Sequence, residues 1–221
     1  MEEFDSPWKE ALEHLLELFL AFCFPEIHAA IDWSRKYESL DTELQQIMHD
    51  AEIGRRLADK LFKVWLKDGG ESFILIHLEA QNQRDALLPE RMYVYNYRIF
   101  DKHRKPVVSL AILGDDDPRW RPSQFTTGLF GCQAGLNYLV VKLLDYAGRI
   151  EELEADPNPF AAVVLAHLKV LETRDDPASR RTWKSRLIKS LYSRGLTGEQ
   201  IRLLFRVLDW MMTLPSELER E

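Results

Sequence analysis

Two acidic residues and a glutamine lie where two predicted strands come together. Asp59 falls in a strand predicted over 57–66, Glu79 falls near the end of a strand predicted over 72–80, and Gln81 follows two residues later. The two glycines between the strands predict a hairpin turn, because glycine accepts a positive φ. The start of one hairpin strand lies beside the end of the other, so Asp59 and Glu79 become neighbours. Carboxylate oxygens are ligands for hard divalent cations such as Mg²⁺ and its substitute Mn²⁺, and the pattern predicts a site for a cation of this class.

A plainer interpretation of the same residues is structural. Acidic residues are common at strand ends, and Asp59 could pair with a lysine while Glu79 only ends its strand. Lys60 and Lys63 border Asp59 in the sequence. They could contact the phosphates of DNA, or they could be solvated lysines on the surface of a strand.

The elements that must position these residues follow from periodicity. Apolar residues recur at helical spacing over 7–22 and 85–103, and a further short helix is predicted over 25–31. Continuous apolar runs at 106–113 and 138–144 predict two more strands. The three acidic residues that begin at Asp115 predict a turn. Together these elements predict an α/β core.

The character of the chain changes after Pro157. Helical periodicity covers 159–172, 177–194 and 198–213, and Thr197 with a glutamine three residues later predicts a capping box. The expected organisation is therefore a core over 1–150 and an all-helical region over 151–221 that packs on it.

The segment ADKLFKVWLKDGGESFILIHLEAQ resembles the core of the PD-(D/E)XK nuclease superfamily, and in particular the recombination-promoting nuclease family of transposase-like proteins. The opening FDSPWKEAL and the tail RLIKSLYSRGLTGEQIRLLFRVLDWMMTLPSEL are similar to the same family. The resemblance implies a restriction-endonuclease-like core, a mixed central sheet flanked by helices. It also implies a Mg²⁺-dependent DNA endonuclease that hydrolyses phosphodiester bonds in recombination, transposition or defence.

The resemblance also implies residue roles. Asp59 and Glu79 would hold the metal, and Gln81 takes the place of a lysine found in better-known relatives. A fourth catalytic member is expected on the first helix, where Glu10 is the choice and Asp5 the rival. Glutamine can orient water or phosphate but carries no charge. The alternative function is therefore a weak or inactive nuclease-like module that binds DNA or a protein.

A basic segment suggests where a nucleic acid would bind. Residues 177–194 hold six basic residues and no acidic one, beginning with Arg180, Arg181 and Lys184. These three are expected to contact DNA phosphates. The alternative is a solvated helix face whose cations pair with the acidic residues of 151–156.

Composition excludes several classes of protein. The 221 residues are 46% hydrophobic, enough to build a core, and the formal net charge of −7 argues against attraction of nucleic acid over the whole surface. The two cysteines cannot form a disulfide framework and fit a cytoplasmic location. The acidic start is unlike a signal peptide, and no membrane association is expected. A homodimer is compatible with the expected activity, because a double-strand cut needs two sites.

Overall fold

The computed structural model describes residues 5–49, 59–79 and 85–219. The chain forms two compact units, and each is described by itself. One unit combines residues 1–25 with 143–221 and is helical; the other comprises residues 26–142 and contains the main sheet. This division differs from the expected boundary at residue 150, because the N-terminal helix packs with the C-terminal helices.

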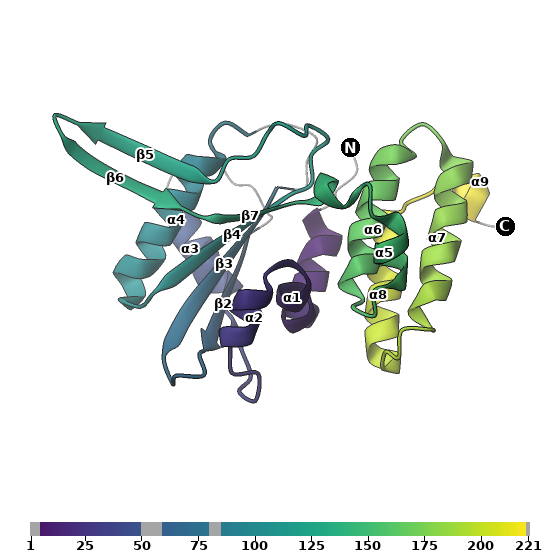
Figure 1. The fold of residues 1–221 in the computed structure, drawn as a ribbon, viewed down its shortest axis with the longest axis horizontal. Coiled ribbons are helices and arrows are strands. Elements are labelled where there is room, and N and C mark those ends of the chain that lie inside the picture. Colours follow the sequence, from purple (N-terminus) through teal and green to yellow (C-terminus); the bar gives the residue numbers. More distant parts are fainter. Residues whose placement is uncertain (1–4, 50–58, 80–84, 220–221) are drawn as a thin grey trace. The chain divides into compact units, whose positions relative to one another are not determined.

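The main sheet of the second unit has five strands in the order β1-β2-β3-β4-β7 (Figure 1). The first three strands are antiparallel neighbours, whereas β3, β4 and β7 run parallel. Helices and a mixed sheet confirm the predicted mixed α/β class. The strand bounds are Glu38–Ser39 for β1, Asp59–Trp65 for β2, Glu71–Glu79 for β3, Val107–Leu113 for β4 and Leu139–Lys142 for β7.

One long helix connects the parallel strands β3 and β4. Helix α4 spans Leu88–His103, and its first turns pack on the carboxyl-terminal end of β4 through Leu88 and Leu113. Its last turns pack on β2 through Ile99 and Leu61. The N-terminus of α4 therefore lies at the carboxyl ends of the parallel strands. The other helices of this unit are α2 (Pro25–Ala30) and α3 (Asp41–His49).

A second, two-stranded sheet was not predicted from the sequence. Strands β5 (Gln124–Leu129) and β6 (Cys132–Asn137) form a hairpin whose turn residues, Phe130 and Gly131, both have positive φ, at 50° and 85°. A Cβ at Gly128 would lie 2.5 Å from a backbone oxygen of the opposite strand, so only glycine fits there. Almost every residue of the hairpin is exposed. The hairpin therefore lacks the buried face from which an alternating pattern would have been recognised.

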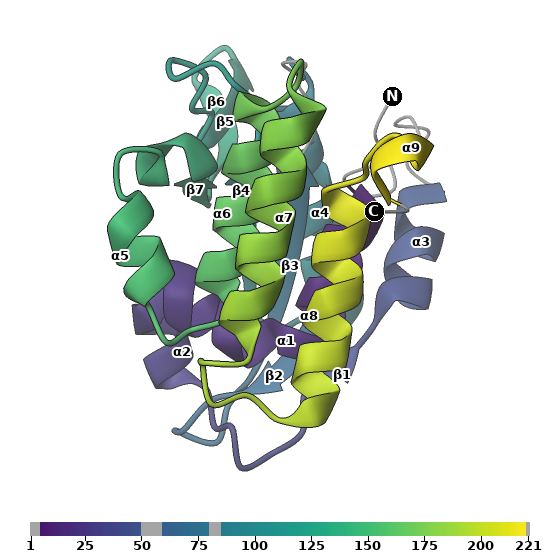
Figure 2. The same ribbon diagram turned by 90° about the vertical axis from the view of Figure 1, so that its right-hand side faces the viewer.

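The helical unit is built around one almost fully buried helix. Helix α6 spans Phe160–Glu172, and its side chains are buried from Phe160 to Val170. Figure 2 shows α6, α7 and α8 side by side. The elements of this unit are α1 (Asp5–Cys23), η1 (Leu143–Tyr146), α5 (Ile150–Ala155), α6, α7 (Pro177–Leu191), α8 (Gly198–Met211) and α9 (Ser216–Glu219).

The N-terminal helix belongs to this bundle because its apolar side chains are buried against it. Trp8 is fully buried, with its ring centroid 6.0 Å from Phe160, and its indole N–H faces His167 Nδ1 at 3.5 Å. The predicted capping box at Thr197 is confirmed at the start of α8, where Gln200 completes it. Within the described ranges, none of the helices is long and apolar enough to span a bilayer.

Candidate functional site

The carboxyl ends of three parallel strands bring polar residues to one edge of the sheet. In the strand register Glu79 lies opposite Leu113, and Leu113 lies opposite Lys142. Asp59 lies opposite His77, which precedes Glu79 by two residues. The predicted acidic positions therefore come to the same end of the β2–β3 pair. The side chains of Asp59 and Glu79 and the whole of Gln81 lie outside the described residues.

The strand register would allow Asp59 and Glu79 to share one cation, but the register alone does not establish a metal site. Diagonal positions of an antiparallel pair are about 7–8 Å apart, a separation that two carboxylates can close around one ion. Among the side chains that the structure describes, no group of three His, Cys, Asp or Glu residues could hold a metal. The predicted Mg²⁺ site thus depends on Asp59 and Glu79 and stays a prediction.

A buried ion pair joins the next two strand ends. Lys142 Nζ donates to Asp115 Oδ2, and both residues are buried, at 3% and 1% exposure. The other oxygen of Asp115 accepts the backbone N–H of Asp117 at 2.9 Å, which confirms the predicted turn. The Lys142 ammonium also lies 5.7 Å from the centre of the Trp120 ring. The pair therefore fixes the segment after β4, here called the edge loop (residues 114–121), onto the strand ends.

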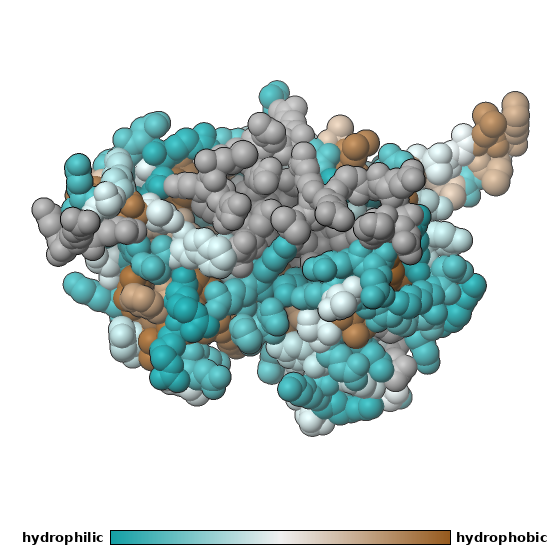
Figure 3. Space-filling view, turned by 180° about the vertical axis from the view of Figure 1, so that it is seen from behind, coloured by the Kyte–Doolittle hydropathy of each residue, from teal (hydrophilic) through white to brown (hydrophobic). Residues whose placement is uncertain are grey.

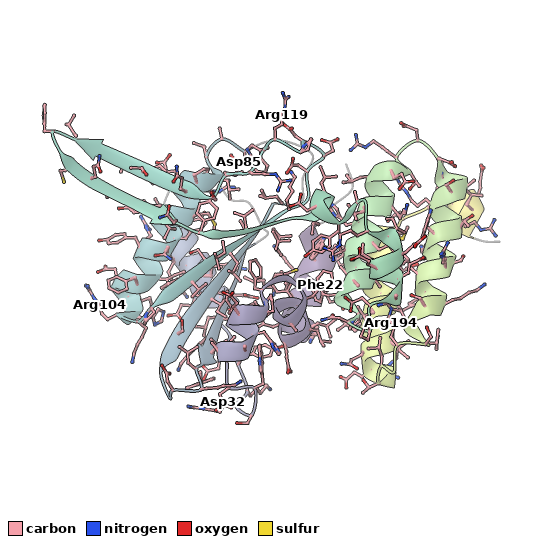
Figure 4. The ribbon with its side chains drawn as sticks, viewed as in Figure 1. Phe22, Asp32, Asp85, Arg104, Arg119 and Arg194 are labelled. Atoms are coloured by element: carbon pink, nitrogen blue, oxygen red, sulfur yellow. The ribbon has the colours of Figure 1, made fainter. Side chains whose placement is uncertain are left out.

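The edge loop presents a cation and an aromatic ring. Arg119 has a side chain that is 87% exposed, and its guanidinium lies 3.7 Å from Asp117. Trp120 is half-buried and packs against an apolar cluster that includes Leu113 and Tyr138. Figure 4 shows Arg119 projecting from this loop. A flexible cation beside a rigid ring is suited to a ligand with an anionic group and an apolar face.

A second acid–base pair lies at the start of α4. Arg91 Nη2 is 2.5 Å from Asp85 Oδ2, and both residues are buried. Asp85 Oδ1 accepts the backbone N–H of Leu87 at 2.9 Å, so the carboxylate also holds the entry to the helix. Figure 4 labels Asp85 at this position. Helix N-termini carry partial positive charge and attract anions.

One apolar cluster connects the two pairs. It contains Leu88 and Met92 of α4, Leu113 of β4 and Tyr138, with Trp120 packed against it. Burial raises the pKa of Tyr138 to about 12. Its hydroxyl is buried and has no hydrogen-bond partner among the described residues. The sequence analysis did not select these pairs, although an acid directly after a buried strand was a signal that could have found Asp115.

The first-helix acid is engaged elsewhere. Glu10 lies in α1 of the helical unit, and its carboxylate accepts bonds from Arg206 of α8, the shorter at 2.7 Å. Asp59 and Glu79 belong to the other unit. The rival Asp5 is the first residue of α1, and its side chain lies outside the described part of the chain. The structure therefore gives Glu10 a partner within the bundle.

Two of the lysines and arginines expected to contact DNA are structural. Lys60 is 5% exposed and pairs with Asp41 of α3, because its position in β2 faces inward. Arg180 is 7% exposed, and its guanidinium donates to the carbonyls of Thr173 at 3.2 Å and Thr213 at 3.3 Å. These contacts correct the expectation that the two residues face a phosphate backbone.

Of the other basic residues expected to contact DNA, one is buried and two lie at the surface. Lys184 is 8% exposed and pairs with Asp209 at 2.7 Å, so the expectation that it faces a phosphate backbone is corrected as well. Lys63 lies 5.0 Å from the ring centre of Trp65. Arg181 lines a surface pocket of about 670 Å³ within the helical unit. The other lining residues are Ala178, Thr182, Ser185, Arg186, Lys189 and Leu218.

Comparison with known proteins gives two partial similarities. The chain is 35% identical over 98 residues to protein O-glucosyltransferase 3 of Rattus norvegicus, covering 43% of this chain and 19% of that protein. It is 36% identical over 81 residues to protein O-glucosyltransferase 3 of Mus musculus, covering 36% of this chain and 16% of the relative. The chain thus spans less than a fifth of the length of these relatives. No family model matches the chain, and no solved structure matches it.

These findings contradict the predicted family. The similarities are to a glucosyltransferase, and no nuclease family matches, so the assignment to the PD-(D/E)XK superfamily is wrong. The predicted Mg²⁺-dependent endodeoxyribonuclease, its role in recombination, transposition or defence, and the nuclease-like alternative are wrong with it. The restriction-endonuclease-like form of the core is not confirmed, and the cytoplasmic location stays a prediction.

Proposed function

We propose that the carboxyl edge of β3, β4 and β7 binds a phosphate-linked glucose donor and serves glucosyl transfer. The observation that carries the proposal is the convergence of three parallel strand ends, the N-terminus of α4 and the edge loop. In α/β proteins ligands bind outside the carboxyl ends of the strands. The name of the two relatives, protein O-glucosyltransferase 3, supports glucose as the sugar.

The exposed and half-buried residues of the edge loop would contact the ligand. Arg119 would pair with a phosphate oxygen, because a guanidinium matches phosphate geometry with two donors. Trp120 would cover one face of the sugar ring, whose C–H groups form an apolar surface. The buried Asp115–Lys142 pair would act as a positioning device, since it fixes the loop and is itself out of reach of solvent.

A divalent cation would be held by Asp59 and Glu79, whose positions come to the same end of the β2–β3 pair. Such an ion, when bound, neutralises phosphate charge and stabilises a departing phosphate. Gln81 would add a neutral hydrogen bond to a phosphate oxygen, since its amide donates without bringing charge.

Calorimetric titration with UDP-glucose, with Mg²⁺ and then with a chelator, tests this proposal. We expect binding that weakens when the metal is removed, and that weakens about tenfold or more in Trp120→Ala and in Asp59→Asn. Glucose release from the donor would report the transfer chemistry.

The matched control is Asp68→Asn. Asp68 is an acid of the same β2–β3 hairpin, but it lies in the turn at the other end, where its side chain accepts the N–H of Gly70 at 2.8 Å. Asparagine keeps that bond, so this variant should bind like the wild type. Equal affinity of Trp120→Ala and wild type, or no binding of UDP-glucose by a folded wild type, would overturn the proposal.

A further inference from the structure

The β5–β6 hairpin contains no charged residue, although charged residues are frequent in the rest of the chain. No Asp, Glu, Lys, Arg or His occurs over residues 122–141, whereas 29% of the whole chain is charged. The hairpin side chains are mostly threonine, glycine, alanine and glutamine. Free strand edges are usually protected by charged residues, which prevent pairing with another chain. This hairpin has no such protection.

The tip of the hairpin exposes two large apolar side chains. Phe130 is 98% exposed and Leu129 is 69% exposed, and Figure 3 shows the hydrophobic tip extending from the surface. Phe130 also adopts a positive φ of 50°, a conformation that asparagine or glycine adopts at lower cost. Turn geometry therefore does not explain a phenylalanine at this position, whereas burial against another molecule does.

The hairpin itself needs support that the described part of the chain does not supply at the tip. At its base Phe125 stacks on Tyr93 of α4 with a centroid distance of 5.1 Å. Neither β5 nor β6 pairs with a third strand among the described residues. An isolated two-stranded hairpin is only marginally stable in water.

Helix α4 offers an apolar surface of matching character in the same unit. Tyr93, Tyr97 and Phe100 follow one another at helical spacing, and the last two are 56% and 45% exposed. We call these three residues the aromatic stripe. It begins at the base of the hairpin, where Tyr93 meets Phe125.

We propose that the hairpin pairs with the hairpin of a second copy of this chain, in antiparallel orientation. The tip of each copy, Leu129 and Phe130, then covers the aromatic stripe of the other. Each strand of six residues is about 20 Å long, and the stripe covers about 10 Å of helix, so the tip of one copy can reach the stripe at the base of the other.

Charge favours a second copy over a charged partner. In a two-fold contact a residue at the axis meets its own copy, so a charge there would meet a like charge. Two copies, each with a formal net charge of −7, repel one another over most of their surface. The neutral hairpin is a region where this repulsion is absent.

Sedimentation analysis from micromolar to millimolar concentration tests the dimer. We expect the mass to rise from that of one chain to that of two, and Phe130→Asn to raise the dissociation constant at least tenfold. This variant creates an Asn-Gly turn, which suits positive φ, so it keeps the hairpin folded while it removes the apolar tip. Tyr97→Gln should weaken the dimer as well.

The matched control is Tyr192→Gln, which removes a 70% exposed tyrosine in the other unit and should leave the dimer unchanged. A wild-type protein that stays monomeric, or a Phe130→Asn protein that dimerises like wild type, would overturn the proposal. Loss of the dimer in Phe130→Asn but not in Tyr97→Gln would overturn the role of the aromatic stripe.

Thiol cross-linking distinguishes the proposed arrangement from a tip-to-tip contact. Cys132 is exposed beside the tip, whereas burial raises the pKa of the Cys23 thiol and slows its reaction. With a short bifunctional reagent, Asp101→Cys beside the stripe should form covalent dimers through Cys132. Covalent dimers of the wild type through Cys132 alone would show a tip-to-tip contact and contradict this arrangement.

Discussion

The Asp115–Lys142 pair shows how a single interaction can position the candidate site. Its two side chains are almost completely buried, so neither can exchange its partner for water. A buried pair contributes little net stability compared with an apolar pair, but the loss of one partner leaves an uncompensated charge. The edge loop should therefore depend on both residues.

Lys142→Ala should destabilise the protein by about 3–5 kcal/mol, because Asp115 would remain buried without its cation. Urea unfolding would measure the change in the free energy of unfolding. Asp101→Ala, which removes one partner of the exposed Asp101–Arg104 pair, should cost less than about 1 kcal/mol. Similar losses in the two variants would show that the buried pair has no special role.

Tyr138 predicts a pH dependence at the same edge. Its pKa is raised to about 12 in the folded protein, whereas an unfolded tyrosine loses its proton near pH ~10. The stabilisation linked to this shift is complete below pH ~10 and is lost as the pH rises toward 12, because the unfolded chain releases the proton first.

Tyr138→Phe should therefore flatten the fall of stability in this alkaline range. Chemical unfolding at a series of pH values would measure it. Tyr192→Phe, at an exposed position, is the control and should follow the wild type. An unchanged slope in Tyr138→Phe would contradict the raised pKa.

At the scale of elements, helix α7 shows why a basic sequence is not a basic surface. Arg180 of α7 donates to the carbonyl of Thr173, at the C-terminal end of α6. Lys184 of α7 pairs with Asp209 of α8. Long basic side chains bury their stems and satisfy carbonyls that end a helix. Two of the basic side chains counted in the sequence of α7 are therefore buried inside the bundle, where they bind a carbonyl and a carboxylate.

Arg180→Ala should cost about 1–3 kcal/mol, since it removes the hydrogen bonds that the buried guanidinium donates to the carbonyls of Thr173 and Thr213. Arg181→Ala, at the next position on the surface side, should change stability by no more than about 0.5 kcal/mol. Thermal unfolding of both variants gives the comparison. Equal melting temperatures would mean that the Arg180 contacts contribute nothing.

At the scale of the whole molecule, the helical unit is built from both ends of the chain. Helix α1 packs on α6 and α8, which follow more than a hundred residues later. Trp8 is fully buried and contacts Phe160 and His167 of α6. The core of this unit therefore contains side chains from segments that lie far apart in the sequence.

Trp8→Ala should destabilise the helical unit by about 3–5 kcal/mol, because it leaves a large cavity in the core. Hydrogen exchange should show lost protection in α6 and α8. Trp210→Ala in α8, where the side chain is 46% exposed, should have a smaller effect. Full protection of α6 in the Trp8→Ala protein would contradict the role of α1 in this unit.

The sequence by itself determined the local elements and the mixed α/β class. Helices with an apolar stripe, the β2–β3 turn with its glycines and the Thr197 capping box depend on residues that are close in the chain, and the structure confirms them. The sequence also predicted that Asp59 and Glu79 lie at one end of a hairpin, because a short turn fixes the register of its strands.

Only the tertiary structure decided which residues meet across long separations. Burial of Lys60, Arg180 and Lys184, the Glu10–Arg206 pair and the assignment of α1 to the helical unit all depend on contacts between distant segments. The exposed β5–β6 hairpin has no buried face to create a sequence pattern. Periodicity records whether a side chain is buried, but it does not record which neighbour buries it, and for this reason the partners of these residues could not be read from the sequence.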